Sequence, residues 1–250
     1  MVWFVGAGPG AEDLITLRGK RLLEEADIVV YAGSLVNEEL LKYVKKDCKV
    51  YNSAYMTLEE VLDVMIRGEK SGEKVVRLHT GDPCLYGAVR EQMDALKEAD
   101  ISYEVCPGVS SFCGAAASLQ AEYTLPGVSQ SVVITRMAGR TPVPDRESIQ
   151  SFAAHRATMV VFLSAGMLDI LSKELTAGGY EPDTPAAIVY KATWPDEKVF
   201  RCTVADLAQT AKKYGVTKTA LIIVGDILEG NYERSRLYHP NFTTEFRTGN

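Results

Sequence analysis

Short apolar segments alternate with segments of helical periodicity along most of the 250-residue chain. The first apolar segment, VWFVG, is typical of a strand, and a glycine-rich turn leads from it into the helical pattern of residues 14–26. Apolar residues recur in that pattern every three to four positions, as one buried face of a helix requires. Strands that alternate with helices predict an α/β fold.

The alternation restarts after a turn-rich bridge at residues 123–130. From Ser131 onward a new series of strands and helices begins, and residues 185–206 have the pattern of a β-hairpin. A chain of this length can bury about 70% of its extended surface, which is enough for two cores. We therefore expect two α/β domains, residues 1–122 and residues 123–250.

Composition excludes several classes of partner. The chain has 27 Lys and Arg against 33 Asp and Glu, a net charge of −6, which argues against nucleic acid and anionic membrane surfaces as main partners. The most apolar segment, residues 159–168, is broken by Ser164 and Gly166 and falls short of the roughly 18 apolar residues of a membrane span. The amino terminus lacks the basic region of a signal peptide, so we expect no membrane association.

The cysteines indicate the compartment. There are five, an odd number, and they are scattered without a C-x-x-C pair or a Cys/His cluster at zinc spacing. Free thiols of this kind are typical of a reducing environment, so we expect a cytoplasmic protein with no protein-bound metal.

The turn at residues 6–10, Gly-Ala-Gly-Pro-Gly, resembles the phosphate-binding turn of dinucleotide-binding domains. Two features disfavour that function. Pro9 removes one backbone N–H from the turn, and the second strand ends in residues 31–34, Tyr-Ala-Gly-Ser, without the acid that would hold the ribose. The other interpretation is a tight strand-to-helix turn without a ligand.

Three more strand ends carry small or turn-forming residues, at 80–83, 107–111 and 163–166. Ligands of open α/β sheets lie outside the carboxyl ends of the strands, and small residues let the backbone approach a flat ligand. Asp82 has two interpretations, since its carboxylate can accept from ribose hydroxyls or an amine of a ligand, or can cap the next helix. His79, which precedes this loop, is expected to be packed in the strand rather than to face a ligand.

Two long segments resemble a known family. Residues 5–19 are similar to the first signature of the tetrapyrrole (corrin/porphyrin) methylases, and residues 75–87 with 107–110 are similar to the second. Residues 31–36, 56–60 and 135–144 resemble the branch that methylates precorrin-4 or cobalt-precorrin-4 at carbon 11 in cobalamin biosynthesis.

The resemblance implies a homodimeric enzyme with two α/β domains, a ligand cleft between them and a fold different from that of Rossmann methyltransferases. It also implies S-adenosylmethionine as methyl donor and a tetrapyrrole, precorrin-4 or cobalt-precorrin-4, as acceptor. The matched positions imply donor contacts from Pro9, Gly81, Asp82, Leu85, Ser110 and Ser111 in the first domain and from Phe162, Leu163, Tyr190, Ala192, Ala220 and Leu221 in the second.

No residue is assigned to proton transfer. Some relatives carry an arginine after the Tyr-Gly of the second motif, but this chain has Ala88 there. The sulfonium methyl is already activated, so positioning of two substrates can supply most of the catalysis. Arg136 and Arg140 are candidates to hold acceptor carboxylates, since guanidinium groups bind carboxylates well. They can equally be solvated surface charges.

Alternative functions remain at this point. The motifs concern the methyl donor, so methylation of another ring carbon or of a diphthamide precursor fits them as well, and cobalt can be present or absent in the acceptor. A nucleotide-linked oxidoreductase and a non-catalytic tetrapyrrole-binding protein are the alternatives from other functional classes.

Overall fold

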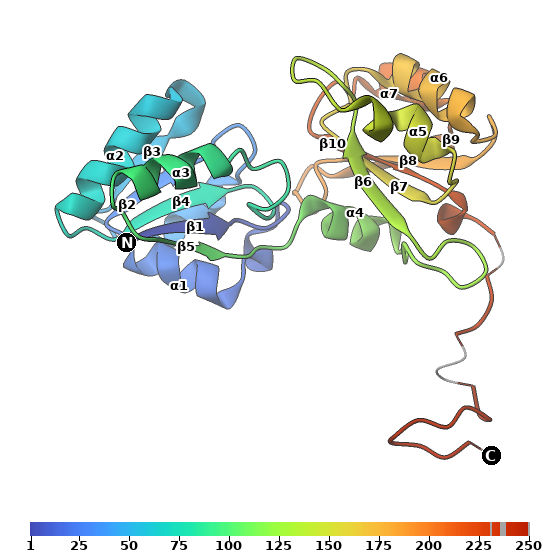
Figure 1. The fold of residues 1–250 in the computed structure, drawn as a ribbon, viewed down its shortest axis with the longest axis horizontal. Coiled ribbons are helices and arrows are strands. Elements are labelled where there is room, and N and C mark those ends of the chain that lie inside the picture. Colours follow the sequence, from blue (N-terminus) through green and yellow to red (C-terminus); the bar gives the residue numbers. More distant parts are fainter. Residues whose placement is uncertain (231, 236–238, 250) are drawn as a thin grey trace. The chain divides into compact units, whose positions relative to one another are not determined.

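The computed structural model describes residues 1–230, 232–235 and 239–249. Contacts divide the chain into two units, which we call unit 1 (residues 1–115 with 191–197) and unit 2 (residues 116–190 with 198–250). Each unit contains one five-stranded sheet with helices packed on it (Figure 1). The two α/β sheets confirm the predicted fold class, whereas the domain division expected after residue 122 stays a prediction.

All strands of the unit 1 sheet are parallel, in the order β3-β2-β4-β1-β5. Central β1 pairs with β4 and β5, so that Val5 lies opposite Leu78 on one side and Cys106 on the other. The carboxyl ends of all five strands therefore meet at one edge of the sheet. The strands are β1 (Val2–Gly6), β2 (Ile28–Tyr31), β3 (Lys49–Asn52), β4 (Val75–His79) and β5 (Tyr103–Cys106).

Helices cover both faces of this sheet. Helix α1 (Leu17–Glu25) lies on one face, and α2 (Leu58–Lys70) and α3 (Arg90–Glu98) lie on the other (Figure 1). Side chains alternate between the faces along each strand, as the two-residue period of a strand dictates. The two apolar clusters that result include Val5, Leu23, Val29 and Leu78 beside α1, and Phe4, Val30, Met65 and Leu96 beside α2 and α3.

Local capping decides where these helices begin. The sequence predicts a helix from residue 14, but residues 12–14 form the 3₁₀ turn η1 (Glu12–Leu14) and α1 starts at Leu17. The Thr16 hydroxyl fixes this start, because it accepts a hydrogen bond from the Gly19 N–H at 3.0 Å. Thr57 followed three residues later by Glu60 predicts a capping box at the start of α2. The structure confirms it, since the Glu60 N–H donates to Thr57 Oγ1 and the Thr57 N–H donates to Glu60 Oε2.

The remaining elements of unit 1 are short. Residues 37–44, expected to be helical, form the 3₁₀ segment η2 (Glu38–Tyr43), and η3 (Ser53–Tyr55) follows β3. Helix α4 (Ser111–Leu119) begins directly after the loop that leaves β5. None of the described helices is long and apolar enough to cross a membrane.

The unit 2 sheet is mixed, in the order β6-β7-β10-β8-β9. Strands β6 and β7 are parallel, whereas β10 runs antiparallel to both β7 and β8. The predicted hairpin is confirmed as the antiparallel pair β8–β9. The end of β6, β7 and β8 and the start of β10 thus share one edge. The strands are β6 (Val132–Arg136), β7 (Thr158–Phe162), β8 (Pro185–Tyr190), β9 (Lys198–Thr203) and β10 (Ala220–Val224).

Three helices pack on this sheet, and two 3₁₀ turns interrupt the connections. The helices are α5 (Ile149–Ala153), α6 (Leu168–Gly178) and α7 (Leu207–Tyr214), and the turns are η4 (Asp145–Glu147) and η5 (Asp226–Leu228). The helix expected over residues 145–155 is split into η4 and α5. The cause is Ser148, whose hydroxyl caps α5 by accepting from the Ser151 N–H at 3.2 Å.

Candidate functional site

The loops that follow β1 and β4 continue to pair beyond the ends of the strands. The Gly8 N–H donates to the Gly81 carbonyl at 3.2 Å, and the Gly81 N–H donates back to the Gly8 carbonyl at 2.8 Å. The Ala7 N–H donates to the His79 carbonyl at 2.7 Å. The glycine turn and the Gly81-Asp82 loop therefore form one backbone platform at the carboxyl edge of the unit 1 sheet.

The loop after β5 joins this platform through glycines. A Cβ atom on Gly6 would lie 2.6 Å from Gly108 Cα, and one on Gly108 would lie 2.8 Å from Gly6 Cα and overlap the Gly81 carbonyl oxygen. Real Cβ atoms do not approach other atoms so closely. The three strand ends can meet only because these positions have no side chain.

Asp82 fixes the platform with both carboxylate oxygens. Oδ1 accepts from the Cys84 N–H and Oδ2 from the Gly108 N–H, each at 2.8 Å. Partial burial raises the pKa of this carboxyl, but the hydrogen bonds from Cys84 and Gly108 outweigh it, and the pKa lies below the ordinary value. Asp82 is thus ionised at neutral pH. It caps its loop, and because it is half-buried its remaining lone pairs are available to a ligand.

Residues 192–194 hold the glycine turn from the other side. Trp194 Nε1 donates to the Pro9 carbonyl at 3.2 Å, and the Ala11 N–H donates to Thr193 Oγ1 at 2.9 Å. A Cβ atom on Gly10 would lie 2.5 Å from Trp194 Nε1 and 2.8 Å from the Ala192 carbonyl oxygen. The structure therefore brings Ala192, a predicted donor contact, next to the turn. Thr193 and Trp194 are not among the predicted contacts, because the sequence pattern places Thr193 at the end of the first hairpin strand and Trp194 in the hairpin turn.

These contacts weigh against a dinucleotide site. The N–H groups of Ala7, Gly8 and Ala11 all donate to protein oxygens, and Pro9 has none to offer. Helix α1 begins only at Leu17, so its amino terminus does not open on the turn. With these N–H groups engaged, the turn offers a pyrophosphate fewer backbone donors than a dinucleotide-binding turn does.

The other predicted residues of unit 1 lie at the same edge. The Leu85 N–H donates to the Asp82 carbonyl at 3.3 Å, and the buried Ser110 accepts at its carbonyl from the Cys113 N–H at 3.0 Å, just ahead of Ser111 and α4. His79 is packed, as expected. It is 4% exposed and stacks on Phe4 with ring centroids 6.1 Å apart.

Five predicted donor contacts of unit 2 lie at one edge of its sheet. Tyr190 at the end of β8 pairs with Ala220 at the start of β10, and Leu221 follows. Phe162 ends β7 and is buried, whereas Leu163 is 63% exposed with a left-handed φ of 52°. Such a conformation is uncommon for leucine, and Ser164 helps to fix it by donating from its hydroxyl to the Phe162 carbonyl at 2.7 Å.

Arg136 ends β6 and organises the loop that follows. Its Nη1 donates to the carbonyls of Met137 and Thr141 at 3.1 and 3.0 Å, and its Nη2 donates to the Pro142 carbonyl at 2.9 Å. Arg140 lies exposed in the same loop. The geometry gives Arg136 a structural role, and the binding of acceptor carboxylates by Arg136 and Arg140 stays a prediction.

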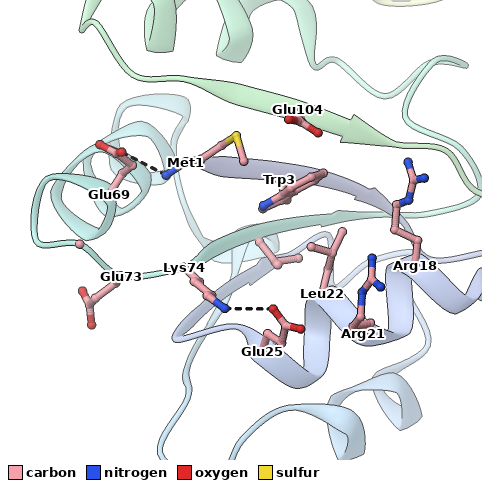
Figure 2. A pocket seen from close by; sticks show the side chains of 12 residues that line it. Met1, Trp3, Arg18, Arg21, Leu22, Glu25, Glu69, Glu73, Lys74 and Glu104 are labelled. Carbon is pink, nitrogen blue, oxygen red and sulfur yellow. Dashed lines mark hydrogen bonds and ion pairs between the residues drawn. The ribbon is translucent and has the colours of Figure 1, made fainter.

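A cavity of about 690 Å³ lies at the opposite edge of the unit 1 sheet, near the amino end of β1 (Figure 2). Four of the charged groups around it form two ion pairs, since Lys74 contacts Glu25 at 2.9 Å and the Met1 amino group contacts Glu69 at 3.0 Å. It lies away from the carboxyl ends of the strands and is not part of the candidate site.

Across the described residues, no three His, Cys, Asp or Glu side chains lie close enough to hold a metal ion. Cys48, Cys84, Cys106, Cys113 and Cys202 are free thiols.

The family model of the tetrapyrrole (corrin/porphyrin) methylases matches residues 1–208. The chain belongs to this family. This tetrapyrrole methylase is 54% identical, over 98% of its chain and 95% of the relative, to the cobalt-precorrin-4 C(11)-methyltransferase of Methanocaldococcus jannaschii.

Solved structures agree with the fold of this methylase. The crystal structure of a cobalt precorrin-4 methyltransferase, described as a cobalamin biosynthetic enzyme, is 44% identical with a TM-score of 0.89, over 92% of this chain and 96% of the other. The uroporphyrin-III C-methyl transferase of Thermus thermophilus, solved with S-adenosyl homocysteine, is 30% identical with a TM-score of 0.77, over 91% and 93% of the two chains.

Proposed function

We propose that this tetrapyrrole methylase transfers a methyl group from S-adenosylmethionine to carbon 11 of precorrin-4 or cobalt-precorrin-4. The observation that carries the proposal is the 54% identity, over nearly the whole of both chains, to a relative that bears the name of this activity. Any cobalt in the reaction belongs to the acceptor.

The platform of unit 1 suits the methyl donor. Its glycines leave backbone atoms uncovered by side chains, and Asp82 places an ionised carboxylate at the same edge. A carboxylate attracts a sulfonium cation and accepts hydrogen bonds from ribose hydroxyls. The relative solved with S-adenosyl homocysteine supports a donor of this type.

We assign the donor contacts as the family motifs imply. In unit 1 these are Pro9, Gly81, Asp82, Leu85, Ser110, Ser111 and Ala192, which surround the platform. The exposed, left-handed Leu163 and its neighbours Phe162, Tyr190, Ala220 and Leu221 are the contacts that we propose from unit 2.

When bound, the donor supplies a methyl carbon that is open to in-line attack, and its sulfur leaves as a neutral thioether. The task of the chain's own residues is then to orient the two substrates, since the proposed reaction requires no covalent nucleophile. Holding two reactants in attack geometry can lower a barrier by about 7–11 kcal/mol. Fixed loops serve this purpose, and Asp82, Trp194 and Thr193 fix the platform through hydrogen bonds to backbone groups.

We further propose a homodimer that works in the cytoplasm. The family resemblance suggests the dimer, and the free thiols fit a reducing compartment. Light scattering after size-exclusion chromatography tests the dimer, with twice the 27.4 kDa chain mass expected. A single-chain mass at micromolar concentration would contradict it.

Methyl transfer from isotope-labelled S-adenosylmethionine tests the activity directly. Precorrin-4 with cobalt, precorrin-4 without cobalt and no acceptor are compared under the same conditions. We expect label in the tetrapyrrole and one equivalent of S-adenosylhomocysteine for each methyl transferred. Acceptor binding without transfer would indicate a carrier protein, and protection in a thermal melt by NADH but not by S-adenosylhomocysteine would indicate an oxidoreductase.

A further inference from the structure

A buried cation lies under the second loop of the platform. Arg77, in the middle of β4, is 6% exposed and packs on the face covered by α2 and α3. Its Nε donates to Gln92 Oε1 at 3.1 Å, and its Nη1 donates to the carbonyls of Val30 and Leu78 at 3.1 and 3.4 Å. All of these acceptors are neutral. A buried charge held by neutral oxygens is costly, so stability alone explains it poorly.

Gln92 carries this contact outward to the loop. It is 4% exposed and is the third residue of α3. Because its Oε1 accepts from Arg77, its amide NH₂ group points the other way, and Nε2 donates to the Ala88 carbonyl at 2.8 Å. A chain of two hydrogen bonds thus runs from the centre of the sheet to the segment between Asp82 and α3.

The segment at the end of this chain is strained. Tyr86 and Ala88 are not glycines, yet they have left-handed φ values of 55° and 48°. Gly87 between them packs so closely that only glycine fits, since a Cβ atom there would lie 3.1 Å from the Pro83 carbonyl carbon. Strained conformations of this kind persist where the surroundings over-determine them, and they gather at ligand sites. Tyr86 is 43% exposed, so the strain presents an aromatic ring at the surface.

We propose that Tyr86 contacts the tetrapyrrole acceptor and that Arg77 and Gln92 are positioning residues that hold it there; this inference rests on the proposed function. The carboxylate of neighbouring Asp82 turns inward to Gly108, toward the donor platform. Tyr86 is 43% exposed, and a flat macrocycle offers a face on which an aromatic ring of this kind can stack.

A double-mutant cycle tests the inference. Gln92→Glu keeps an acceptor for Arg77 but replaces the donor to the Ala88 carbonyl with a carboxylate oxygen, so it releases the segment while Arg77 stays paired. We expect about a five- to tenfold rise in the KM for the tetrapyrrole and less than a twofold change in the Kd of S-adenosylhomocysteine. Tyr86→Ala should raise the same KM similarly, and Gln92→Glu should add nothing in the Tyr86→Ala background.

Gln209→Glu, on the exposed side of α7, is the matched control and should leave the KM unchanged. If Gln92→Glu does not fold, Gln92→Met removes the hydrogen bonds of Gln92 to both Ala88 and Arg77 without adding a charge, and it can take the place of Gln92→Glu in the cycle. If the wild-type enzyme is active, two results would overturn this inference while leaving the proposed function intact. One is that the effects of the two substitutions on the KM add; the other is that the Gln92 variant has a lowered melting temperature but an unchanged KM. A wild-type enzyme that methylates no tetrapyrrole would overturn the proposed function and this inference with it.

Discussion

The backbone N–H of Gly108 donates a 2.8 Å hydrogen bond to the carboxylate of Asp82. This bond joins the loops that leave β4 and β5, and the second oxygen of the same carboxylate holds the Cys84 N–H. One side chain thus sets the distance between two strand ends that the proposed donor site requires. The sequence leaves open whether Asp82 caps the next helix or binds a ligand. In the structure it holds the Cys84 and Gly108 N–H groups of two loops instead, and it can still accept from a ligand, because one carboxylate can accept several hydrogen bonds.

Replacement of Asp82 should therefore weaken both stability and donor binding. Asp82→Ala leaves the Gly108 and Cys84 N–H groups without their acceptor, which should cost about 2–3 kcal/mol of unfolding free energy. Calorimetry should show at least a tenfold weaker affinity for S-adenosylhomocysteine, roughly 1.4 kcal/mol or more. Asp183→Ala, at an exposed position of unit 2, is the control. Unchanged affinity in Asp82→Ala would remove Asp82 from the donor site.

Gly108→Ala should disrupt the platform by crowding. The added methyl would overlap the Gly81 carbonyl oxygen and lie 2.8 Å from Gly6 Cα, so the loops would have to separate. Overpacking of this kind typically costs about 1–3 kcal/mol, which urea titration can measure. In the control Gly139→Ala, the new methyl lies no nearer than 4.0 Å to any atom. Equal stability of the two variants would show that the platform is looser than described.

Trp194→Phe tests whether residues 192–194 hold the glycine turn. The phenyl ring keeps much of the packing on Gly10 but loses the hydrogen bond from Nε1 to the Pro9 carbonyl. We expect a loss of about 1 kcal/mol and about threefold to tenfold weaker binding of S-adenosylhomocysteine. Trp3→Phe, at the amino end of β1, should leave this affinity unchanged. If both variants behave alike, Trp194 has no particular role at the turn.

His79 makes the stability of the chain depend on pH. Burial, together with the nearby Arg77 charge, lowers the pKa of its imidazole from 6.5 to about 3. In the unfolded chain the His79 imidazole therefore becomes protonated below about pH 6.5, whereas in the folded chain it stays neutral until about pH 3. The free energy of unfolding therefore has its full value with respect to this group above pH 6.5, and it decreases as the pH falls, by up to about 1.4 kcal/mol per pH unit.

Urea titrations between pH 7 and pH 4 check this dependence. His79→Leu should show a flatter decline than the wild type, whereas His155→Gln, at an exposed position, should retain the wild-type slope. Identical slopes for the wild type and His79→Leu would mean that the imidazole titrates normally.

Local patterns predicted the local structure of this chain well. The alternation of strands and helices, the capping box at Thr57 and the packed state of His79 are all present. The prediction that α1 starts at Leu14 was wrong. The apolar spacing extends back to Leu14, but the Thr16 side chain caps the helix and so fixes its start at Leu17.

Long-range contacts could not be predicted in this way. Trp194 bonds to a turn 185 residues earlier in the chain, and no periodicity or motif in the sequence links the two. The two hydrogen bonds that link Arg77, Gln92 and Ala88 could likewise not be predicted from the sequence, since neither an arginine nor a glutamine indicates by its type that it has a buried partner. Motifs thus located the loops that meet at the carboxyl edge of the unit 1 sheet, and tertiary packing supplied the side chains that fix them.

Methyl transfer to carbon 11 is the activity that we propose for this methylase. It can be tested by incubation with precorrin-4, with and without cobalt, and S-adenosylmethionine labelled with ¹³C in its methyl group, followed by NMR of the product. We expect one new labelled methyl signal, coupled to carbon 11 of the macrocycle. A labelled methyl on any other ring carbon would contradict it.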